Sequence, residues 1–176
     1  MAADLKTKYP AASADSIALT CTLASLATSS TLLAGREATA VDNTTNLDLD
    51  HLLSGVIRVG TTPTIDTRIE VWVYAPIRIA SGTPTYPDVL DGTDSDETIT
   101  SAGVKWGVLR LVQSLVVDAT TTDRDYAFLP VSVARLFGGV LPPFWGVFVT
   151  HNTGVSLNST GSNHYLHYHR IQRQSV

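Results

Sequence analysis

The stretch Ile69-Glu70-Val71-Trp72-Val73-Tyr74 decides the fold class. Aliphatic residues alternate with larger side chains over six positions, and this period-two pattern indicates a β-strand. One face of the strand carries three aliphatic side chains, while the opposite face carries Trp72 and Tyr74. Because a strand with one wet side is apolar on one face only, we expect both faces of this strand to be covered.

The composition of the whole chain is also typical of a β-protein. Its 176 residues include 23 Thr and 18 Val but only 3 Lys and 3 Glu. Val and Thr suit pleated, half-buried surfaces, whereas Lys and Glu furnish exposed helix faces. The length is that of one domain, and 44% hydrophobic residues allow a sizeable core. We expect a single β-domain over residues 16–176, preceded by an arm over residues 1–15 that orders only against a neighbour.

Strand-like patterns recur along the chain between turn-forming residues. With no long helical pattern, they predict an all-β fold, an antiparallel β-sandwich or jelly roll of about eight to nine strands. Pro130 and the pair Gly138-Gly139 predict one short helix between them. The polar stretch 80–102 is too long for a hairpin turn, and we expect it to face a partner. The predicted strands cover residues 16–26, 37–41, 53–59, 68–79, 107–117, 126–129, 145–151 and 165–172.

The charge pattern argues against two kinds of partner. The formal net charge is −4 and the arginines are scattered, so no basic stripe can neutralise nucleic-acid phosphates. No run approaches the roughly 18 apolar residues of a membrane span, and residues 1–10 lack the apolar core of an export signal. Only 16% of the residues are charged. We interpret this scarcity as a sign that outer faces are committed to neighbouring subunits, which predicts a homo-oligomer.

Four aromatic residues form the candidate oligomer or partner surface. Trp72 and Tyr74 lie on one strand, and Phe144 and Phe148 lie on another, each opposite a row of aliphatic residues. Aromatic residues are enriched at protein interfaces. The alternative is that loops of the same chain cover these faces.

The histidines near the end of the chain raise the question of a metal site. His167 and His169 point the same way on a strand, and His151 is a third candidate ligand. The spacing from Gly161 matches the opening of the cupin metal motif, and cupins are jelly rolls. The positions of the cupin glutamate ligand, however, hold Arg173 and Gln174. We therefore expect these histidines to be ordinary strand residues rather than ligands.

Other candidate sites have less support. Cys21 alternates with aliphatic residues, which predicts a buried packing role. The sequence contains no nucleophile elbow, P-loop or G-x-G-x-x-G, so we expect no catalytic residue, no cofactor and no enzymatic activity. A run of acids in the stretch 80–102 has oxygen ligands for calcium but not the spacing of an EF-hand loop, which favours a solvated loop. These acids are Asp88, Asp91, Asp94, Asp96 and Glu97.

Over residues 20–172 the chain resembles the small jelly-roll virion proteins of tailed bacteriophages, the decoration or cement proteins of the head. The resemblance implies a non-enzymatic protein, made in the host cytoplasm, that sits on the outer capsid surface as a homotrimer or homodimer. It also implies that the major capsid protein is the partner and that binding stabilises the capsid lattice. The residues that carry it are Leu32-Leu33-Ala34-Gly35-Arg36-Glu37 before Val41-Asp42-Asn43, the strand 69–74, and Leu141-Pro142-Pro143-Phe144-Trp145-Gly146 before Thr150-His151-Asn152-Thr153-Gly154.

Two other functions remain open from the sequence. A β-sandwich can present aromatic residues and Asp to sugars, so the alternative is a carbohydrate-binding module on a tail fibre or spike. The second is a degenerate cupin-like metal enzyme that uses His151, His167 and His169.

Overall fold

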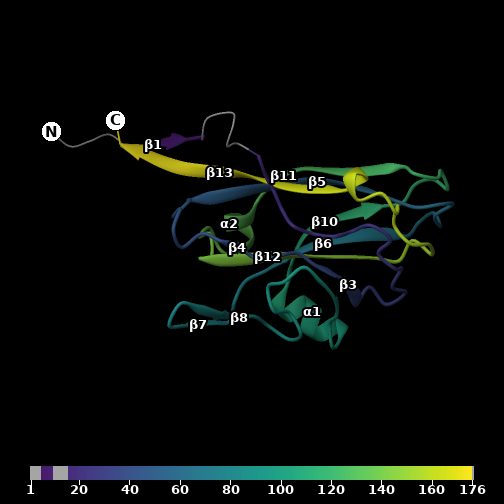
Figure 1. Cartoon of the computed structure of the whole chain (residues 1–176), viewed down its shortest axis with the longest axis horizontal. Coiled ribbons are helices and arrows are strands. Elements are labelled where there is room, and N and C mark those ends of the chain that lie inside the picture. Colours follow the sequence, from purple (N-terminus) through teal and green to yellow (C-terminus); the bar gives the residue numbers. More distant parts are fainter. Residues whose placement is uncertain (1–4, 10–15, 176) are drawn as a thin grey trace.

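The computed structural model describes residues 5–9 and 16–175 (Figure 1). In these residues, antiparallel strands form two sheets that pack face to face, and a small hairpin projects beside them. The antiparallel β-sandwich predicted from the sequence is thus confirmed. Neither of the two short α-helices in this part of the chain is long and apolar enough to cross a membrane.

The first sheet has the order β1-β13-β5-β11, and β2 also pairs with β13. In β5, every second residue from His51 to Ile57 is buried while those between are half-buried. This alternation is the pattern of a strand with one face on a core. The strands are β1 (Leu5–Lys8), β2 (Ile17–Ala18), β5 (Asp50–Arg58), β11 (Asp125–Ser132) and β13 (Tyr165–Ser175).

The second sheet has the order β10-β6-β12-β3-β9, and β4 also pairs with β12. Its two central strands, β6 and β12, are buried on both faces over almost their whole length. The expectation that both faces of residues 69–74 are covered is therefore confirmed. The strands are β3 (Ala34–Glu37), β4 (Val41–Asp42), β6 (Arg68–Tyr74), β9 (Ser95–Thr98), β10 (Arg110–Val116) and β12 (Phe144–His151).

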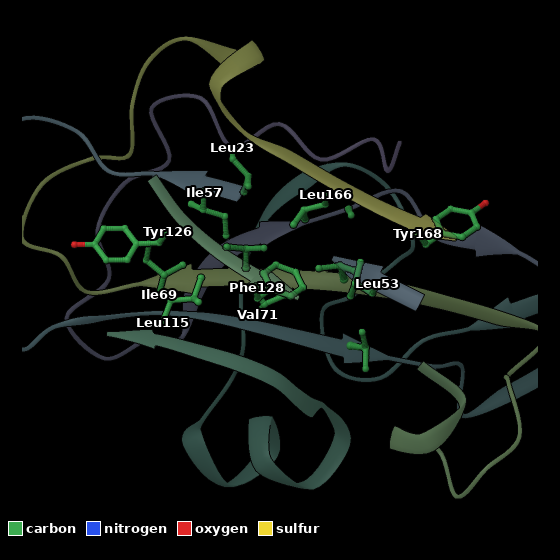
Figure 2. Packing of buried hydrophobic residues seen from close by; sticks show 14 of the residues in the cluster. Leu23, Leu53, Ile57, Ile69, Val71, Leu115, Tyr126, Phe128, Leu166 and Tyr168 are labelled. Atoms are coloured by element: carbon green, nitrogen blue, oxygen red, sulfur yellow. The ribbon is translucent and has the colours of Figure 1, made fainter. Parts of the chain in front are cut away.

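The main hydrophobic core fills the space between the two sheets. Figure 2 shows Leu53 and Phe128 of the first sheet lying against Val71 of the second. Leu53 and Val71 are fully buried, and each such aliphatic side chain stabilises the fold by about 1.5–3 kcal/mol. Cys21 packs at the edge of this core, and its burial raises the pKa of the thiol, which confirms its packing role.

A third layer covers the outer face of the second sheet. Helix α1 (Ala102–Val108) and the segments 86–94 and 99–101 on either side of β9 bury a second apolar cluster on Trp72, Tyr74 and Phe148. Most of the stretch 80–102 therefore packs on the chain's own sheet through a few buried residues, while its other side is exposed to solvent. Only its beginning projects, in a hairpin of β7 (Arg78–Ala80) and β8 (Thr83–Thr85) that pairs with neither sheet.

Several boundaries differ from those expected. Residues 107–109, predicted as strand, belong to or follow α1, which begins after the N-cap Ser101. Pro130 lies in β11, and the predicted short helix is only the turn α2 (Val133–Leu136). A 3-10 helix, η1 (Gly161–Asn163), precedes β13. Residues 19–31 follow the edge of the sandwich instead of forming a long strand, because their backbone groups bond to both sheets, as in Leu19 N to Leu166 O.

The predicted arm is a strand over part of its length. β1 pairs with the end of β13, with Lys8 opposite Gln172. Residues 1–4 and 10–15 of the predicted arm lie outside the described residues.

Candidate functional site

The aromatic residues proposed as a partner surface are mostly interior. Trp72, Tyr74 and Phe148 have no exposed surface in a single chain. Trp106 of α1 packs edge-on against Trp72, with ring centroids 4.7 Å apart, and Tyr86 packs likewise against Tyr74. This corrects the sequence prediction for those three residues, because the chain's own third layer covers them. The fourth, Phe144, is half-buried at the start of β12.

A buried ion pair fixes the third layer to the sheet. The ammonium group of Lys105 donates to Oε2 of Glu70 and to the carbonyl of Leu32, both at 2.6 Å. Trp72 donates its indole N–H to the same carboxylate. Burial alone would raise the pKa of Glu70, but the hydrogen bond and charge of Lys105 outweigh it and hold the pKa below its ordinary value. These groups are occupied in holding α1 to β6.

Glu37 holds residues 91–92 of the third layer to the second sheet. Its buried carboxylate accepts hydrogen bonds from the Tyr74 hydroxyl and from the backbone N–H of Asp91 and Gly92. Burial raises the pKa of Glu37, although all three hydrogen bonds act in the opposite direction. Gly146 leaves room for the Tyr74 ring, because a Cβ at position 146 would collide with that ring.

A buried His–Asp pair lies where the first sheet meets the loop before β5. Trp145 donates its indole N–H to Nδ1 of His51 at 2.9 Å, so Nε2 carries the ring proton and donates to Asp48 at 3.0 Å. Arg170 donates twice to Asp48, at 2.7 and 3.0 Å. Burial lowers the pKa of His51. The pair resembles a catalytic dyad, but the nitrogen that would take a proton from a nucleophile is already bonded to Trp145.

The three histidines considered as metal ligands lie in two different places. His151 is buried in β12, where its Nε2 donates to the carbonyl of Leu26 at 3.1 Å. His167 and His169 lie on the outer side of the first sheet, and Ser16 is hydrogen-bonded to His167. Across residues 5–9 and 16–175, no group of three or more His, Cys, Asp or Glu side chains is placed to hold a metal ion.

The acids of the stretch 80–102 are bonded to their own neighbourhood. Asp88 accepts from the backbone and hydroxyl of Thr100, at 2.8 and 2.6 Å. Asp94 accepts from Arg36 and Thr22. Hydrogen bonds of this kind hold the covering segment in its path across the sheet.

The outer side of the first sheet, by contrast, is uncovered. Among the described residues, no helix or strand lies over it (Figure 1). Tyr165, Val56 and Ala127 form a row across three strands. Leu129 is 84% exposed and Tyr165 49% exposed. We call this surface the open face; its residues are Leu52, Ser54, Val56, Ala127, Leu129, Tyr165, His167 and His169. The ion pair between Arg58 and Asp125 borders it in the neighbouring row.

Exposed aliphatic residues also gather at one end of the sandwich. This end, where β5 and β12 begin, carries the β7–β8 hairpin and the β1–β13 pair, at the left in Figure 1. Ile77 beside the hairpin is 70% exposed, and Val140 and Leu47 in neighbouring loops are 72% and 75% exposed. We call it the projecting end.

The opposite end of the sandwich is polar. A depression of about 570 Å³ there is lined mainly by Thr, Ser and Asn side chains, and its lining contains no aromatic residue. Asn158 spans it and donates to Asp123 at 2.7 Å. The two ends therefore differ in the polarity of their loops.

No known protein family, curated protein or solved structure matches this chain. The surfaces described above are therefore the basis for assigning a function. The open face could not be recognised from the sequence by its aromatic residues, because Tyr165 is the single one on it. The weaker signal was present in β5, where Leu52, Ser54 and Val56 put two aliphatic residues on the side away from the core.

Proposed function

We propose that this protein is a non-enzymatic structural component of a virion, a decoration protein that binds the outer surface of a bacteriophage head. The single observation that carries the proposal is the open face, an uncovered sheet surface on which Leu129 and Tyr165 are exposed and whose charged side chains, Arg58 and Asp125, lie at its border and pair with each other. A soluble monomer seldom exposes such a face, because exposed apolar surface promotes association. In an assembly, the open face would be buried against a partner.

The remaining features support a role in assembly. The buried carboxylates and histidines that could serve chemistry are occupied in holding layers together, as in the pairs Glu70–Lys105 and Asp48–His51. The projecting end adds a second apolar contact region at a distance from the open face. A part that touches several lattice subunits in this way gains avidity without any exceptional single contact. Binding only to the assembled lattice then stabilises it by mass action.

The alternative of a carbohydrate-binding module has weaker support. The aromatic side chains that suggested it, Trp72, Tyr74 and Phe148, are covered by the third layer. The polar depression at the other end of the sandwich contains no aromatic residue on which a sugar ring could stack.

The proposal is tested by mixing the purified protein with expanded heads that lack it and sedimenting the heads. We expect saturable binding, and we expect Leu129→Lys or Tyr165→Lys on the open face to weaken it by at least about tenfold, since a buried lysine in an interface core is unfavourable. Ile65→Lys, at the polar end, is the matched control, because Ile65 is also 49% exposed. Absence of binding to heads would refute the proposed function, whatever the variants do.

A further inference from the structure

The end of β13 continues beyond the sandwich as part of a two-stranded ribbon. Ile171 lies opposite Asp50, the first residue of β5, so residues 172–175 have β1 as their pairing strand among the described residues. We call residues 5–8 and 172–175 the basic ribbon. Two-stranded pairs of this size are marginal in water without further contacts. The ribbon therefore needs a partner to be held firmly.

The basic ribbon differs in charge from the rest of the chain. It carries Lys6, Lys8 and Arg173, all exposed, and no acidic residue, whereas the whole chain has a formal net charge of −4. Lys6 and Lys8 are two residues apart and so lie on the same face of β1. The ribbon thus presents two of the three lysines of the chain at a strand edge that no other described residue pairs with.

An open edge of opposite charge lies at the far side of the second sheet. β9, with the sequence Ser-Asp-Glu-Thr, ends that sheet. Ile99 donates its N–H to Leu33 of the neighbouring segment, so by alternation the amides of Asp96 and Thr98 point away from β3 toward the free edge. β9 itself carries Asp96 and Glu97, and Asp94 directly precedes it. Arg36 of the neighbouring strand bonds to Asp94 and Asp96. Asp88 bonds to Thr100, two residues after β9.

A groove of about 160 Å³ lies beside β9. It is lined by residues 96–98 of β9, by Ala34 and Gly35 of β3 and by the segment 26–28. The side chain of Asp96 is 75% exposed. β9 and β1 each span four residues, about 13 Å of extended chain. The β1 and β9 edges are thus equal in length and opposite in charge.

We infer that the basic ribbon of one copy adds its β1 edge to the β9 edge of a second copy, so that a sheet continues from one subunit into the next. Backbone hydrogen bonds supply the affinity in such strand addition. Lys6 and Lys8 pair with the acids around β9, which fixes register and excludes other edges. The contact joins two different surfaces, so repetition closes a ring or builds a chain of subunits. This inference concerns self-association and does not depend on binding to a capsid.

Sedimentation velocity of the purified full chain at low ionic strength tests it. We expect an oligomer that dissociates as salt is raised, because exposed charges are screened. Lys6→Glu with Lys8→Glu, or Asp96→Lys with Glu97→Lys, should weaken self-association by at least about tenfold, and combining all four changes should restore it. Arg110→Glu with Arg135→Glu makes the same change in net charge at other exposed positions and serves as the control.

A proline substitution separates strand addition from simple charge attraction. Thr98→Pro removes an N–H that points away from β3, so it should leave the fold intact by circular dichroism and still weaken the oligomer at least about tenfold. A monomeric wild-type protein, or an oligomer that both the Lys6/Lys8 and the Thr98 variants leave unchanged, would overturn the inference. The binding of the Leu129 and Tyr165 variants to heads tests the proposed function separately, whether or not the protein self-associates.

Discussion

The ammonium group of Lys105 lies 2.6 Å from the carboxylate of Glu70, beneath helix α1 and against the outer face of the second sheet. Both side chains are at least 94% buried, and the ammonium group also lies 4.6 Å from the centre of the Trp72 ring. The pair joins the third layer to β6. It thereby determines that the aromatic residues of this face belong to the interior rather than to a partner surface.

Replacing Lys105 by Met should therefore destabilise the protein. The substitution leaves the Glu70 carboxylate buried with only the half-exposed Arg68 as a cation, and we expect the free energy of unfolding to fall by about 3 kcal/mol. Urea denaturation followed by tryptophan fluorescence measures this. The double variant with Glu70→Gln should recover part of the loss, because no uncompensated charge remains. A loss below about 1 kcal/mol for the single variant would contradict this role of the pair.

Stability should also fall in mild acid because of His151. Burial lowers the pKa of His151 from 6.5 to about 4, so the unfolded chain binds the proton more tightly than the folded one. The stability that the neutral ring contributes is complete above pH 6.5 and is lost as the pH falls through 4, up to about 3 kcal/mol. Urea titrations at several pH values should show this slope, and His151→Gln should reduce it. An equal slope in both proteins would rule out the assignment.

The cluster around Asp48 should hold the end of β13. Asp48→Asn removes the charge that Arg170 and His51 contact, and we expect a loss of about 2 kcal/mol together with faster hydrogen exchange at residues 170–172. Asp118→Asn is a matched control, since it breaks an exposed pair with Arg124 and should cost less than about 0.5 kcal/mol. Similar losses in the two variants would indicate that burial of the cluster is unimportant.

The β7–β8 hairpin should matter for binding and not for folding. Ile77 and Ile79 are 70% and 41% exposed, so changing both to Ser should alter the free energy of unfolding by less than about 1 kcal/mol. If the projecting end touches the head, the same variant should bind expanded heads more weakly, while Ile65→Ser should not. Unchanged binding by the hairpin variant would remove the hairpin from the proposed contact.

Periodicity identified the fold class because it reports local geometry. The alternation of residues 69–74 and 145–151 identified the two central strands of the second sheet. What covers their second face depends on contacts between distant segments, such as Leu90 and Ile99 with Trp72, and no local pattern contains that information. The sequence showed two apolar faces, but both a partner and the chain's own third layer satisfy that pattern.

Helix α1 was missed for a related reason. Gly103 and Gly107 make residues 102–108 a poor helical sequence, yet Ser101 caps the helix and Val104 and Val108 pack into the cluster under it. Tertiary packing thus determines this helix more than propensity does. The Asp48–His51–Arg170 cluster was equally hidden, since its members are separated by up to 122 residues.

Electron microscopy of particles that carry a labelled copy of the protein shows whether it lies on the outer surface of the head. Ser162→Cys places a thiol at the exposed polar end, away from the projecting end, while Cys21 should stay unlabelled because burial raises the pKa of its thiol. If the protein decorates the head, we expect gold labels at repeating positions on the outer surface of the head. Labels confined to the tail, or particles without label, would contradict it.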